Sequence, residues 1–67
     1  NKIDDSIVVL ETALQIFPNH SNAIYSLGMA WQKKGNIAKA RSYFEKALEL
    51  NPDNQDVKDR LAELNKK

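Results

Sequence analysis

Cysteine is absent from the 67 residues of this chain, and histidine occurs once, as His20. Without cysteine no disulfide can form, and a structural zinc site typically needs four cysteine or histidine ligands. A chain of this length buries only about 60% of the surface that its unfolded form exposes, so its core is small. We therefore expect support from close helix packing, self-association or a neighbouring domain, and we predict no metal and no cofactor.

A dominant charge of one sign is also lacking: 10 Lys and Arg residues oppose 9 Asp and Glu residues, for a net charge of +1. Such a balanced chain creates no field that would attract nucleic acid or an anionic membrane surface. No apolar run approaches the roughly 20 residues that a membrane-spanning helix needs. The expected partners are proteins or peptides, with no nucleic acid and no membrane. The lack of cysteine slightly favours the cytoplasm as the compartment.

Glycine and proline are scarce, with two of each, and their positions divide the chain. Pro18 and Pro52 each follow a helical pattern and would end it, since the residue before a proline is driven out of the helical region. Gly35 follows two lysines, the usual order at the C-terminal end of a helix. Apolar residues recur between these breaks with the helical period, and the short linkers require antiparallel neighbours. The pattern predicts an all-α chain with helices at about residues 4–17, 22–34, 37–50 and 54–65, and with N-caps at Asn19, Asn36 and Asp53.

Gly28 is the exception, because it lies inside the second predicted helix. Glycine at such a position costs about 1 kcal/mol relative to alanine. We interpret it as a place where another helix approaches closely. Trp31 and Phe44 are expected to be largely buried between the second and third helices.

An internal repeat runs through the chain. Pro18 and Pro52 are separated by 34 residues (52 − 18), and Leu27 and Leu61 share this offset. The other pairs at the same offset are Ile3 with Ile37, Leu10 with Phe44, Glu11 with Glu45, Ala13 with Ala47, Leu14 with Leu48, and Ile16 with Leu50. A helix–turn–helix unit of this period has the spacing of a tetratricopeptide repeat.

Residues 21–54 resemble one complete tetratricopeptide repeat. The matching motif is Ile24-x-x-Leu27-Gly28-x-x-Trp31, followed by Ala40-x-x-x-Phe44, Ala47 and Pro52. The family has a large aromatic residue where Ile24 stands and usually tyrosine where Trp31 stands. Residues 1–20 resemble the second helix of a preceding repeat, and residues 55–67 resemble the first helix of a following one. The apolar pattern decays in this last segment, as is typical of a C-terminal capping helix. The resemblance implies a single domain over residues 1–67, a short right-handed superhelical solenoid fragment made of antiparallel helix-turn-helix repeats.

The resemblance also implies a concave groove lined by the first helix of each repeat. The side chains that it places there are Asn22, Tyr25, Met29, Gln32, Lys33 and Arg60, with Asp56, Asp59 and Glu63 continuing the groove on the last helix. Tyr25 and Met29 lie off the apolar face of their helix, and both residue types suit adaptable protein contacts. The alternative is that these two residues pack on neighbouring helices and that the charged residues form a solvated cap face.

One ligand type known for this family is not expected here. Some members bind the C-terminal carboxylates of heat-shock chaperones with Lys, Asn and Arg side chains. Arg60 matches one basic position of that clamp, but Ser26 stands where an Asn is needed. Asp56 stands where a Lys is needed and would repel the carboxylate.

Catalytic residues are not indicated by the sequence. His20 lies in a turn between helices, where such residues ordinarily serve as caps. Asp4 and Asp5 are adjacent and suit the start of a helix. No glycine-rich phosphate-binding loop is present, because Gly28 and Gly35 are isolated. We predict that the chain is not an enzyme.

The leading interpretation is a protein–protein interaction module, a helical scaffold that binds a peptide or a partner through its concave face. The alternative is a structural C-terminal appendage that packs on a larger parent protein, such as a bacterial hydrolase. The chain begins with Asn1 and not with methionine, so we interpret it as a fragment or a processed form.

Apolar residues spread around the first predicted helix, which indicates that this helix either self-associates or needs a preceding helix. The residues expected to form a homodimer contact are Ile3, Ile7, Val8, Leu10 and Leu14.

Overall fold

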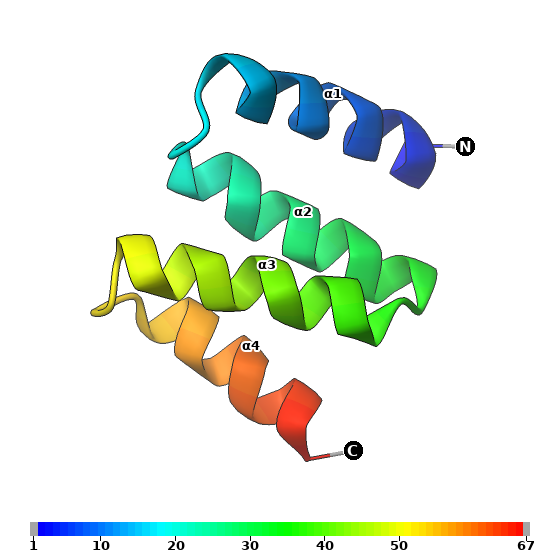
Figure 1. Ribbon diagram of the computed structural model, residues 1–67. Helices are drawn as coiled ribbons and strands as arrows, with labels where there is room; N and C mark the ends of the chain where they lie inside the picture. The colour runs from blue at the N-terminus through cyan, green and yellow to red at the C-terminus, as the bar shows by residue number, and fades with distance from the viewer. Residues whose placement is uncertain (1, 67) are drawn as a thin grey trace.

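The computed structural model describes residues 2–66 and places four α-helices along this range (Figure 1). They are α1 (Lys2–Ile16), α2 (Ser21–Lys34), α3 (Ile37–Leu50) and α4 (Gln55–Asn65). Each helix runs antiparallel to the one before it, and α1 and α4 lie at opposite ends of the stack. No strand occurs in the described range, so the predicted all-α class is confirmed. The first helix begins two residues earlier than predicted, and the last begins one residue later.

Of the three N-caps predicted from the sequence, one is observed and two are wrong. Asn36 caps α3 as predicted, with its side-chain oxygen accepting from the Lys39 amide at 3.1 Å. Asn19 and Asp53 are not caps, because the residues that follow them take that position. His20 Nδ1 accepts a hydrogen bond from the Ala23 amide in the first turn of α2, at 3.3 Å. Asn54 Oδ1 accepts one from the Val57 amide in the first turn of α4, at 3.4 Å.

The hydrogen bonds that close the two turns containing proline explain why each cap lies one residue later than predicted. The His20 amide donates to the Phe17 carbonyl, and the Asn54 amide donates to the Asn51 carbonyl, each at 3.1 Å. These bonds define four-residue turns in which proline takes the second position, where its fixed φ suits the turn. The residue after the proline is therefore the third residue of the turn, and the helix begins only after the fourth.

Replacing Asn54 with alanine tests this assignment. We expect Asn54→Ala to lower the free energy of unfolding by about 0.5–2 kcal/mol, because it leaves an amide of the first turn of α4 without its acceptor. Asp53→Ala is the matched control and should cost less than about 0.5 kcal/mol. Urea denaturation followed by circular dichroism measures both. A larger loss for Asp53→Ala than for Asn54→Ala would contradict the observed caps.

The core lies mainly between α2 and α3 and continues to α4. Ile24 and Phe44 are fully buried and belong to one apolar cluster between the two helices. Leu27 of α2 is fully buried as well. Trp31 is partly buried beside them, with the Lys39 ammonium 4.3 Å from its ring centroid, a cation–π contact. Three residues of α4 complete the apolar interior: Val57, Leu61 and Leu64.

The contact at Gly28 confirms the prediction that another helix approaches α2 closely at this position. A Cβ atom built at Gly28 would lie 2.6 Å from Cε1 of Phe44, well inside van der Waals contact. The missing side chain therefore lets the ring of Phe44 lie directly against the backbone of α2.

Gly35 ends α2 in the left-handed conformation, with φ of 90°. Its amide and that of Asn36 donate to the carbonyls of Gln32 and Trp31, each at 3.0 Å. These bonds satisfy two carbonyls that the end of the helix leaves unpaired, which is the usual role of glycine at this position.

An ion pair ties the start of α1 to the end of α2. The Lys34 ammonium donates to the Asp4 carboxylate, and this hydrogen bond lowers the pKa of Asp4 below its ordinary value. Both side chains are exposed to a large degree, so the pair contributes little to the free energy of unfolding.

The apolar residues of α1 divide into two groups. Ile7 is buried, and Ile3, Leu10 and Leu14 are half-buried, on a helix whose main neighbour is α2. The exposed apolar side chains are Val8, Val9 and Ile16, followed by Phe17 in the turn. The dimer contact predicted from the sequence therefore needs correction at Ile7, because its own chain already covers that side chain.

Candidate partner-binding groove

A depression of about 450 Å³ lies between α2 and α4. Tyr25 of α2 forms one side, and Asp56, Asp59, Arg60 and Glu63 of α4 form the other. The four residues of α4 follow the i, i+3, i+4, i+7 spacing that places side chains on one face of a helix. The depression thus brings together residues that lie 31 or more positions apart in the sequence (56 − 25).

Tyr25 is held in place by the core beneath it. Its ring lies 5.7 Å from that of Phe44, centroid to centroid, at an interplanar angle of 49°. Phe44 is fully buried and packs against the Tyr25 ring, which restricts the movement of that ring, and Tyr25 remains partly accessible. A tyrosine held in this way offers contact surface at a low cost in conformational entropy.

The charge of the depression is acidic. Three carboxylates, those of Asp56, Asp59 and Glu63, surround one guanidinium, that of Arg60, for a formal charge of −2 (1 − 3). The side-chain amide of Gln55 donates to Asp59 Oδ1 at 2.9 Å, which orients that carboxylate. The arrangement suits a ligand that brings a Lys or Arg side chain close to an apolar or aromatic group.

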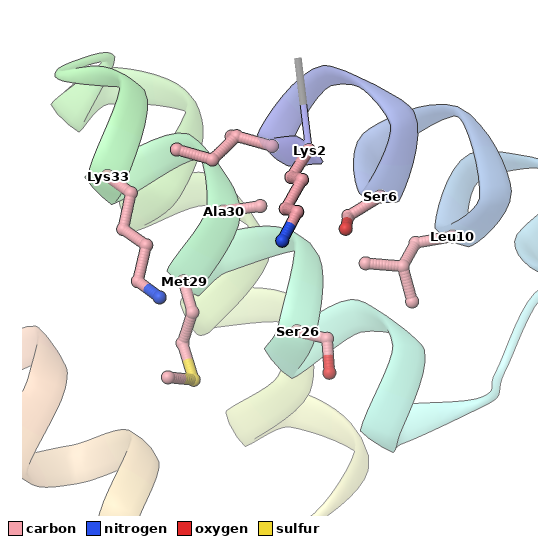
Figure 2. A pocket seen from close by; sticks show the side chains of 8 residues that line it. Lys2, Ser6, Leu10, Ser26, Met29, Ala30 and Lys33 are labelled. Carbon is pink, nitrogen blue, oxygen red and sulfur yellow. The ribbon is translucent and has the colours of Figure 1, made fainter.

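A second depression, of about 360 Å³, lies between α1 and α2 (Figure 2). Figure 2 shows Met29 and Lys33 of α2 at this site, together with Ser6 and Leu10 of α1. The remaining lining residues are Lys2, Ile3, Ser26 and Ala30.

The predicted concave set is therefore divided between two places. Tyr25 and Arg60 meet in the depression between α2 and α4, whereas Met29 and Lys33 line the one between α1 and α2. Asn22 is exposed and Gln32 is half-buried, and neither lines either depression. Sequence reasoning considered Ser26 only as the residue in place of an Asn of the chaperone clamp, and it missed Ser6, because small polar residues on a helix carry little signal of their own.

The residues considered for catalysis have structural contacts. His20 uses Nδ1 as the N-cap of α2, and Asp4 is paired with Lys34. Over residues 2–66, His, Asp and Glu side chains form no group of three that could hold a metal ion. Among the helices of this described range, none has both the length and the apolar character needed to cross a membrane.

Comparison with known proteins decides the family. The family model described as "Tetratricopeptide repeat" matches residues 21–54, the segment from the start of α2 to the N-cap of α4. The chain belongs to the tetratricopeptide repeat family. Tetratricopeptide repeats form helical scaffolds for protein interaction, and the four-helix architecture of this chain is of that type.

Relatives of the chain are much longer proteins. Protein O-mannosyl-transferase TMTC1 of Homo sapiens is 33% identical over 66 residues, which cover 98% of this chain and 8% of that protein. Protein arginine N-methyltransferase 9 of Homo sapiens is 36% identical over 59 residues, covering 88% of this chain and 7% of the relative. The Protein CTR9 homolog of Arabidopsis thaliana is 35% identical over 54 residues, which cover 79% of this chain and 5% of that protein. The chain thus spans less than a tenth of the length of each of these relatives.

Proposed function

We propose that this tetratricopeptide repeat chain binds an extended peptide, or a peptide segment of a partner protein, in the depression between α2 and α4. The observation that supports this most is the pairing of a fixed Tyr25 with an acidic wall on α4. That depression lies on the face that the family resemblance implies to be concave. Met29 and Lys33 lie on the same helix but line the depression against α1, so they are not part of this site.

The chemistry of the depression defines the class of peptide. An apolar or aromatic ligand side chain can pack on the accessible face of Tyr25. A neighbouring Lys or Arg can then pair with Asp59 or Glu63, and such charged hydrogen bonds are stronger than neutral ones. A C-terminal carboxylate is disfavoured, because the three carboxylates of α4 would repel it and only Arg60 would attract it.

A displayed library of random peptides tests the proposal with a defined probe. We expect enriched peptides to carry a basic residue next to an apolar one. Tyr25→Ala and Asp59→Asn should each raise the dissociation constant of a selected peptide by about tenfold or more, which corresponds to a loss of about 1.4 kcal/mol of binding free energy. Lys46→Ala, an exposed change on α3, is the matched control and should leave the dissociation constant unchanged. Failure to enrich any peptide, or equal affinity in all three variants, would contradict the proposal.

A second candidate function is that of a structural appendage of a larger parent protein. It is favoured by the relatives named as transferases, since the chain aligns with only 8% of one and 7% of the other. In that case the depression between α2 and α4 would be covered by the parent. A peptide selected on the 67-residue chain would then fail to bind the longer protein.

A further inference from the structure

The side of α1 and α2 that faces away from α3 carries a continuous groove. The depression shown in Figure 2 shares Ser6, Leu10 and Ser26 with an adjoining one of about 390 Å³. The adjoining depression adds Asp5 and Val9 of α1 to the lining. Together they extend along residues 2–10 of α1 and residues 26–33 of α2, as a binding site for another helix would.

The register of α1 indicates what the groove accepts. At the 34-residue offset, Ser6, Leu10 and Ala13 take the places that Ala40, Phe44 and Ala47 hold in α3. Those three residues of α3 are buried, and Phe44 lies against the backbone of α2. Ser6 and Leu10 line the groove, and Ala13 follows on the same side of α1 by its i+7 spacing from Ser6. This side of α1 thus has a large apolar residue between two small ones, the pattern that receives a helix elsewhere in this chain. Small residues allow two helix axes to approach closely.

We propose that the occupant is α1 of a second copy of this chain, in a symmetric dimer. A two-fold axis perpendicular to α1 makes the two α1 helices antiparallel to each other. The second α1 is then parallel to α2 of the first copy, because α1 and α2 are themselves antiparallel. This is the orientation that a helix would need to pack on α1 as α2 packs on α3.

The distribution of exposed apolar side chains supports α1 as the element that both copies supply. Of the five large apolar residues that are most exposed in the described range, four lie on α1 or in the turn after it. They are Val8, Val9, Ile16 and Phe17, with exposed fractions between 61% and 66%. Val9 and Ile16 are seven residues apart, so they lie on one side of α1, and Val9 lines the groove. In the dimer these two side chains reach α2 of the other copy.

The other helices of a second copy are unsuitable. α2 and α3 each bury several of their apolar residues within the chain, and the one large apolar side chain of the pair that is exposed, Leu50, lies at the end of α3. α4 buries Val57, Leu61 and Leu64, and its exposed positions include Lys58 and Asn65. A helix with a polar outer face would gain nothing by entering a groove lined by Leu10 and Val9.

Charge favours the same antiparallel arrangement. Lys2 and Lys33 lie at one end of the groove, beside the start of α1 and the end of α2. The last turn of α1 contains no basic residue to complement its carbonyl groups. Antiparallel pairing brings the C-terminal end of each α1 to the two lysines of the other copy, which suits the helix dipole. The dimer contact inferred from the structure therefore consists of Ser6, Val9, Leu10, Ala13 and Ile16. None of these residues lines the depression between α2 and α4.

Analytical ultracentrifugation of matched α1 variants tests the proposal. We expect the 67-residue chain to reach a mass twice its 7.6 kDa as concentration rises. Val9→Glu should weaken association by about tenfold or more, because each dimer would bury two carboxylates beside apolar groups. Val8→Glu is the control: Val8 is 62% exposed against 66% for Val9, yet it lines no part of the groove. A chain that stays monomeric at all concentrations, or equal effects of the two changes, would overturn the proposal.

Engineered disulfides test the orientation, since the chain contains no cysteine of its own. With the two-fold axis between Val9 and Leu10, Ser6 of one copy faces Ala13 of the other. The double variant Ser6→Cys, Ala13→Cys should give covalent dimers on oxidation. The two positions are about 10 Å apart along one helix and cannot bond within a chain. Ser6→Cys alone is the control and should cross-link little. Equal cross-linking of the single and double variants would exclude the antiparallel pairing.

Discussion

Gly28→Leu is expected to lower the free energy of unfolding by about 1–3 kcal/mol, the usual cost of overpacking. This loss occurs although leucine favours a helix over glycine by about 1 kcal/mol. The reason is geometric: a Cβ at this position would lie 2.6 Å from Cε1 and 2.7 Å from Cδ1 of Phe44. The ring is fully buried, so it cannot turn away into solvent. Urea denaturation followed by circular dichroism measures the change.

Ala62→Leu is the matched control for this substitution. Ala62 stands 34 residues after Gly28 and takes the corresponding place on α4, but its side chain is exposed. The control should change the free energy of unfolding by less than about 0.5 kcal/mol. A double-mutant cycle gives a further check, because Gly28→Ala should cost less when Phe44→Leu has removed the ring edge. A Gly28→Leu variant as stable as the parent chain would show that α2 and α3 have space for a larger side chain between them.

Phe44→Ala is expected to have the largest effect of any single substitution, a loss of about 3–5 kcal/mol. Phe44 is fully buried and contacts the Gly28 backbone and the Tyr25 ring, so its removal leaves a cavity at the centre of the α2–α3 pair. Small domains have only about 5–15 kcal/mol of stability in total, and a chain of this size lies near the lower end. The variant should therefore lose its cooperative unfolding transition.

Tyr43→Ala provides the comparison for Phe44→Ala. Tyr43 precedes Phe44 on α3 but is only half-buried, so its removal should cost less and leave a cooperative transition. Thermal and urea denaturation of the two variants side by side measures the difference. Equal losses in the two variants would contradict the placement of Phe44 at the centre of the core.

The sequence predicted α3 correctly at both ends, and the reason is local. Asn36 supplies a cap at its start, and Asn51 and Pro52 leave no way to continue the helix beyond Leu50. The caps of α2 and α4 were placed one residue too early, because the four-residue turns around Pro18 and Pro52 depend on hydrogen bonds that composition does not reveal. Gly28 could be interpreted in advance because glycine within a helix needs a reason from packing.

The candidate site was predicted less completely than the fold. Helical periodicity shows which residues share a side of α2, but it does not show which neighbouring helix each side meets. Tyr25 therefore meets Arg60 as expected, whereas Met29, one turn later, lines the groove against α1. Periodicity also placed Ile7 in the expected dimer contact, but Ile7 is buried within its own chain, on a helix that packs against α2.

Amide chemical-shift mapping is the most direct test of the proposed peptide binding. An isotope-labelled sample of the chain would be titrated with a selected basic peptide, and its NMR spectrum followed to saturation. The largest shifts should fall on residues 22–33 of α2 and 56–63 of α4, with little change on the exposed side of α3. Shifts that are absent, or that concentrate on α3, would contradict binding between α2 and α4.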